Sequence, residues 1–150
     1  MKIVTNATEV DGIRVVQDYE EIAKALENGE TVLHWEGGDS LRPLINHLEH
    51  CAISPIDPND VKVGDCVFCR MTDEETQIKY YMVHQVWQIS DASYDGKKWF
   101  KIGSTMTSVY GWTQEVLGLA KGTNIYQNHR VWDKMMEEKA KMRENEEVYS

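Results

Sequence analysis

The stretch that decides the fold is Gly37-Gly38-Asp39-Ser40-Leu41-Arg42-Pro43. It follows an apolar run at 31–35, which predicts a buried strand, and precedes an amphipathic segment at 44–48, which predicts a short helical turn. The two glycines let the backbone bend sharply, so Ser40 is expected at the start of that turn, where backbone N–H groups collect. There the hydroxyl fits two roles: a nucleophile beside an oxyanion site, or an N-cap that accepts a backbone hydrogen bond. Taken alone, the pattern favours the cap.

An ordered series of strand and turn signals comes after Ser40. The signals lie at 61–68, 81–86, 100–104, 111–112 and 116–118. With the serine stretch, this order resembles the catalytic core of the signal peptidase and LexA-type serine peptidase superfamily over about residues 31–120. That family carries Gly-x-Ser-Met-x-Pro, then a Val-Gly-Asp strand, then a strand with the general base. The base is lysine in bacterial signal peptidases and LexA-type repressors, and histidine in endoplasmic-reticulum and archaeal signal peptidases.

The resemblance implies a catalytic pair. Ser40 takes the position of the nucleophile, and His84, in Val83-His84-Gln85, takes the position of a histidine base. In a strand, the neighbours of His84 face the opposite side of the sheet, so the imidazole stands on its own face. The alternative for His84 is a structural histidine in a polar niche of a half-buried sheet. The backbone N–H of Ser40, with the turn at Gly38 and Asp39, is expected to form the oxyanion hole.

The chain departs from the family pattern at three positions. Histidine-type members have an aspartate that orients the base, and the matching residue here is Ser104. Ser104 is therefore a third-position candidate through a neutral hydrogen bond, and Asp91 and Asp95 are candidates from the loop before it. Loss of the orienting carboxylate costs about 10⁴ in turnover in a serine protease with a Ser-His-Asp triad, so slow chemistry is expected. Leu41 replaces the family's methionine, and Gln85 replaces its usual arginine.

Composition narrows the class of protein. The 150 residues carry a formal net charge of −9, which argues against a nucleic-acid partner, and their number predicts a single domain over residues 1–150. No run approaches the roughly 18 apolar residues of a membrane span, and residues 1–6 lack the apolar core of a secretory signal. A cytoplasmic protein without a membrane partner is expected. Cys66 and Cys69 are separated like a zinc or redox pair, but in a strand they face opposite sides, which favours reduced thiols. No metal or cofactor is predicted.

The predicted fold class is β-rich α+β. A hairpin is expected within 2–16, and Asp18 before 19–27 is typical of a capped amphipathic helix. Successive hairpins across 31–120 predict a coiled, barrel-like antiparallel sheet. The apolar spacing at about 128–147 predicts a C-terminal amphipathic helix with Trp132 and Met136 buried. That helix suits packing against the sheet, or alternatively a partner.

Two functions are compatible with these observations. The first is a soluble serine endopeptidase, a hydrolase that cleaves a protein partner, a peptide or its own chain through Ser40 and His84. The second is a catalytically inactive binding or assembly module on the same fold, which the serine at position 104 favours. A small soluble form of such a core suits a bacteriophage or mobile-element protein.

Overall fold

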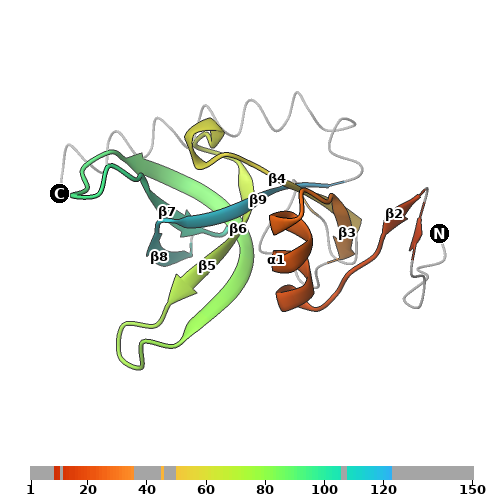
Figure 1. Ribbon diagram of the computed structural model, residues 1–150. Coiled ribbons are helices and arrows are strands. Elements are labelled where there is room, and N and C mark those ends of the chain that lie inside the picture. The colour runs from red at the N-terminus through yellow and green to blue at the C-terminus, as the bar shows by residue number, and fades with distance from the viewer. Residues whose placement is uncertain (1–8, 11, 36–44, 46–49, 106–107, 123–150) are drawn as a thin grey trace.

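The computed structural model describes residues 9–10, 12–35, 45, 50–105 and 108–122. Within them, the chain forms one seven-stranded antiparallel sheet, a two-stranded hairpin and one α-helix. Figure 1 shows the helix beside the strongly curved sheet. The predicted C-terminal helix at 128–147, with Trp132 and Met136, lies outside the described residues. The described part of the chain is therefore β-rich, as expected.

The N-terminal part ends in the helix α1, Tyr19–Glu27. Before it, β1 (Glu9–Val10) pairs with β2 (Ile13–Arg14) around Gly12, whose positive φ of 80° suits glycine. Asp18 caps the helix, because its carboxylate accepts hydrogen bonds from the N–H groups of Glu20 and Glu21 at 2.8 and 3.4 Å. The apolar face of α1 then packs on the sheet.

The large sheet is built from seven strands in the order β3-β4-β9-β5-β6-β7-β8. Along the chain these are β3 (Val32–Trp35), β4 (His50–Pro55), β5 (Cys66–Thr72), β6 (Lys79–Ser90), β7 (Trp99–Gly103), β8 (Val109–Thr113) and β9 (Glu115–Gly122). A short 3-10 helix, η1 (Pro58–Asp60), connects β4 to β5. All neighbouring strands in this sheet are antiparallel. From β5 to β8 each strand pairs with the next one in the chain, whereas β9 inserts between β4 and β5, which are distant from it in sequence.

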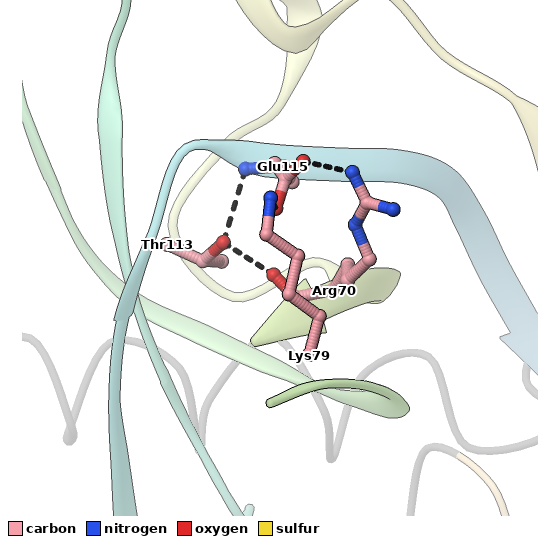
Figure 2. A network of polar contacts seen from close by, with 4 residues as sticks. All are labelled: Arg70, Lys79, Thr113 and Glu115. Atoms are coloured by element: carbon pink, nitrogen blue, oxygen red, sulfur yellow. Dashed lines mark hydrogen bonds and ion pairs between the residues drawn. The ribbon is translucent and has the colours of Figure 1, made fainter. Parts of the chain in front are cut away.

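The expectation of a barrel needs correction, because the sheet is open rather than closed. Its two edges are β3 and β8. The sheet nevertheless bends sharply where β8 runs into β9, and Figure 2 shows this corner. Thr113 donates a hydrogen bond to the backbone oxygen of Arg70 in β5, and accepts one from the backbone N–H of Glu115 at 3.0 Å. The bend thus brings edge strand β8 toward β5, although the two are not neighbours in the sheet.

Two hydrophobic clusters lie on the two faces of the sheet. The cluster under α1 contains Ile22, Leu26, Val32, Ile53, Phe68 and Val83, among others. The second contains Val61, Val67, Cys69, Val86, Phe100 and Ile102, among others. Because successive residues of a strand alternate between faces, β5 and β6 contribute to both clusters. The central strands are therefore fixed from both sides, which makes them a rigid support for polar side chains.

Candidate active site

The predicted nucleophile and its turn lie outside the described residues. These are Ser40, Gly38 and Asp39. The two ends of the connection that contains them are described, because Trp35, the last residue of β3, pairs with His50, the first residue of β4. Within that connection, Ile45 is buried. The strand pair of Trp35 and His50 thus marks the two ends of the connection 36–49.

His84 lies in the middle of β6, as the sequence predicts. It pairs with Val67 of β5, and its ring contacts Tyr110 of β8 with centroids 4.5 Å apart and ring planes at 84°. Its neighbours Val83 and Gln85 are buried, and the Gln85 amide donates to the backbone oxygen of Gly64 at 3.1 Å. Alternation along β6 therefore puts the imidazole on the other face from Val83 and Gln85, as expected from the sequence.

Ser104 directly follows β7 and lies next to His84 of the neighbouring strand. Gln85 pairs with Gly103, so the antiparallel register carried one step further aligns Ser104 with His84. Ser104 is buried, and its hydroxyl oxygen accepts a hydrogen bond from the N–H of Ser108 at 3.0 Å. Its carbonyl accepts a further bond from the indole N–H of Trp87 at 2.7 Å. These contacts hold Ser104 at the end of β7.

The glycine before Ser104 has a steric role. A Cβ at Gly103 would lie 2.5 Å from the backbone oxygen of Ser108 and 2.7 Å from Nε1 of Trp87. Backbone at 2.5 Å cannot give way cheaply, so only glycine fits between Trp87 and the turn after β7. The Gly-Ser pair that the sequence singles out is therefore required by packing, and it determines where Ser104 lies.

The other two third-position candidates are not brought to His84. Asp91 and Asp95 are exposed in the loop after β6, and Asp91 lies seven residues beyond His84, roughly 20 Å along the strand. The Asp95 carboxylate accepts hydrogen bonds from the N–H of Lys97 at 3.0 Å and from the amide of Gln114 at 3.1 Å. The Lys97 bond is the largest cause that lowers the pKa of Asp95. Both aspartates therefore belong to their own loop.

The Val63-Gly64-Asp65 signal forms a tight connection to β6. The N–H of Gly64 donates to the Val86 oxygen, and the N–H of Val86 donates to the Asp65 oxygen, each at 2.8 Å. The Asp65 carboxylate accepts from the N–H of Lys62 at 2.9 Å. Burial raises the pKa of Asp65, with the Lys62 bond acting in the opposite direction. This motif therefore holds β6 in place at Val86, two residues after His84.

The described cysteines and acidic residues were compared with the requirements of a metal centre. Across the residues that the structure describes, no group of three or more His, Cys, Asp or Glu side chains is arranged to hold a metal ion. Cys66 belongs to the cluster under α1 and Cys69 to the other cluster, so their side chains occupy opposite faces. Burial raises the pKa of the Cys69 thiol to about 12. A thiol with that pKa is not a nucleophile near neutral pH.

Comparison with known proteins assigns no family to the chain. It was compared with protein-family models, with curated proteins and with solved structures, and none of them matches it. No helix in the described part of the chain has the length and apolar character that a membrane crossing needs. A functional assignment therefore depends on the geometry of His84 and on the order of the sequence motifs.

Two residues near the candidate site were not predicted from the sequence. Tyr110, whose ring contacts His84, belongs to an edge strand and carries no motif of its own. Trp87, whose indole binds the carbonyl of Ser104, is one of five tryptophans with nothing local to distinguish it. Both residues come close to the candidate site only because of the way in which the strands pair.

Proposed function

We propose that this protein is a serine endopeptidase with Ser40 as nucleophile and His84 as general base. The observation that supports the proposal most is the pairing of Gln85 with Gly103, because it aligns Ser104 with His84. In the family that the sequence resembles, these two positions hold the base and the residue that orients it. The rigid, doubly packed strand β6 gives a base the fixed position that proton transfer requires.

The proposed chemistry is acyl transfer in two steps. As the Ser40 oxygen bonds to the scissile carbonyl carbon, the hydroxyl proton passes to His84, and the carbonyl oxygen becomes an oxyanion. The backbone N–H of Ser40, with the turn at Gly38 and Asp39, stabilises that oxyanion. The imidazolium then gives its proton to the leaving amine as the carbon–nitrogen bond breaks. Water, activated by His84, hydrolyses the ester and restores the serine.

The neutral third residue makes this reaction slow. A serine hydroxyl next to the imidazole offers a hydrogen bond but no negative charge, so the imidazolium formed during attack is less stabilised than beside aspartate. The proposed substrate is therefore cleaved once or few times, as in processing of a protein partner or of the chain itself. Buried thiols at Cys51, Cys66 and Cys69 suit a reducing compartment such as the cytoplasm.

The test is intact-mass spectrometry over several days, with the purified chain alone and with a mixture of extended peptides. We expect cleavage products with the wild type and none with Ser40→Ala or with His84→Gln. Ser93→Ala, which changes a partly buried serine in the loop after β6, is the matched control and keeps the activity. Circular dichroism of all variants checks that the fold is kept. Identical traces for wild type and Ser40→Ala refute the peptidase.

A second function is favoured by one observation. Ser104 stands where the family has aspartate, and its hydroxyl already accepts a hydrogen bond from the N–H of Ser108. The same fold then serves as a binding or assembly module without catalysis, which would suit a bacteriophage or mobile-element protein. If this is the function, peptides bind equally well to wild type and to Ser40→Ala, and neither protein cleaves them.

A further inference from the structure

A hollow of about 590 Å³, whose lining does not include His84, lies between the β5–β6 loop, β7 and the β8–β9 corner. This volume lies in the range of small-molecule sites. Two tryptophans line the hollow, Trp99 of β7 and Trp112 of β8, and we name it the Trp99–Trp112 hollow. Trp99 is 37% exposed and Trp112 is 41% exposed, although tryptophan is usually well buried. Two exposed aromatic rings in one concavity are typical of a ligand-binding site.

The two indoles come from one face of a strand pair. Lys101 pairs directly with Trp112, so Trp99, two residues before Lys101, is the diagonal neighbour of Trp112 on the same face. Diagonal neighbours in antiparallel strands have Cα atoms roughly 7–8 Å apart, which is within reach of aromatic side chains. Phe100, between Trp99 and Lys101, is fully buried in the opposite direction. The strand pair therefore presents its tryptophans outward while it is anchored by its core face.

The polar wall of the hollow is fixed before any ligand binds. Glu115 forms ion pairs with Arg70 and, at 3.5 Å, with Lys79, and Figure 2 shows how these side chains converge. The hydrogen bond from Arg70 lowers the pKa of Glu115, so the carboxylate is ionised near neutral pH. Gln114, next to it, donates to Asp95 at 3.1 Å. A fixed wall lowers the entropy cost of ordering side chains on binding.

The charges around the hollow balance. Glu74 and Glu115 are acidic, and Lys79 and Lys97 are basic, although the whole chain carries −9. Gln77, Gln114 and two threonines add donors and acceptors. An ion gains little from a balanced rim, and a purely apolar ligand would displace the water at these polar groups without replacing its hydrogen bonds. The lining instead suits an uncharged ligand that has many hydroxyl groups and an apolar ring face.

We propose that the Trp99–Trp112 hollow binds a short neutral oligosaccharide. The C–H faces of the sugar rings lie on the two indoles, and the hydroxyl groups exchange hydrogen bonds with the glutamine, glutamate and lysine side chains. This site is independent of the proposed peptidase, because it uses neither Ser40 nor His84. The protein would thus carry a sugar-binding surface on the same sheet as its candidate active site.

The experiment begins with an array of neutral glycans probed with the full chain, followed by titration of an array-positive glycan by ¹H–¹⁵N NMR. We expect saturable shifts of the indole N–H signals of Trp99 and Trp112, while those of Trp35 and Trp87 stay in place. Trp99→Ala and Trp112→Ala each weaken binding about tenfold or more, as expected for the loss of a stacking ring. Tyr94→Ala removes a fully exposed ring outside the hollow and leaves the affinity unchanged.

Three results would overturn the proposal. The first is an array without a bound neutral glycan. The second is binding that both tryptophan variants retain at full strength, which would put the sugar elsewhere. The third is a hollow whose indole signals respond to extended peptides and to no glycan, which would assign the surface to a peptide. Trp112→Phe, which keeps a ring and protects the fold, should bind more tightly than Trp112→Ala.

Discussion

The imidazole of His84 lies edge-to-face with the ring of Tyr110, with centroids 4.5 Å apart, although β7 separates their two strands. A tilted aromatic pair of this kind is worth about 0.5–1.5 kcal/mol beyond its buried area. Tyr110 is thus in a position to hold the orientation of the proposed base.

Tyr110→Ala should therefore lower the cleavage rate roughly two- to tenfold, because the His84 ring loses the contact that orients it. Tyr110→Phe keeps the ring and should keep the rate. The measurement is the cleavage rate of both variants, together with the His84 side-chain signals in ¹H–¹³C spectra. Equal rates for alanine and phenylalanine would show that Tyr110 does not orient the base.

Ser104→Asp should accelerate cleavage. A carboxylate beside His84 favours the imidazolium that forms during attack, and it raises the pKa of His84, so the activity should begin at higher pH than in the wild type. Ser104→Asn has the same size without the charge and serves as the control. Because Ser104 is buried, the charge also lowers the free energy of unfolding. A variant that folds but cleaves no faster than Ser104→Asn would contradict the proposed third position.

Glu115→Gln should lower the free energy of unfolding at pH 7 by about 1 kcal/mol, because the pairs with Arg70 and Lys79 are lost. The folded pKa of Glu115 is lowered, mainly by the hydrogen bond from Arg70. Its contribution is therefore present above the ordinary pKa of glutamate and is lost as the pH falls through the folded value. Urea unfolding at pH 7 and at pH 3 checks this, with Glu74→Gln as an exposed control. A difference that persists unchanged at pH 3 would contradict the assignment.

The effect of Asp65→Asn on the free energy of unfolding should depend on pH in the opposite direction to that of Glu115→Gln. Burial raises the folded pKa of Asp65, so this group favours the fold at low pH, and that contribution is lost as the pH rises through the folded value. Asparagine keeps an oxygen for the N–H of Lys62 and carries no charge. The variant should be more stable than the wild type at pH 7 and similar to it at low pH. Thermal unfolding between pH 3 and pH 8 measures the difference, and a variant less stable at pH 7 would overturn it.

Local patterns predict much of the fold. Runs rich in apolar, β-branched and aromatic residues mark β5, β6 and β7, and Asp18 marks the start of α1, because these signals act within a few residues. The open sheet was not predicted, because closure depends on whether the edge strands β3 and β8 pair with each other, which no pattern within a strand specifies. The bend between β8 and β9 was not predicted either, since only Gln114 lies between the two strands and it is no turn signal.

The candidate site was predicted only in part, because only some of its residues carry a local sequence signal. His84 and Ser104 carry motifs in fixed order, so both could be proposed from the sequence, and the pairing of β6 with β7 aligns them. The loop aspartates were candidates as partners because the sequence does not reveal whether a loop folds back toward His84; β6 continues to Ser90, and the loop after it stays far from His84. Tyr110 and the Trp99–Trp112 hollow depend on which strands become neighbours and on the bend at Thr113. Such long-range pairings leave no local pattern in the sequence.

The most direct test of the central claim is the pH dependence of Ser40-dependent cleavage. The rate is measured between pH 5 and pH 9 on a peptide that the wild type cleaves, with Ser40→Ala subtracted as background at each pH. A Ser40–His84 dyad predicts a sigmoidal rise as His84 loses its proton, in the range in which imidazoles titrate, about pH 6.5. No difference from Ser40→Ala at any pH, or a Ser40-dependent rate that is flat through that range, would contradict the dyad.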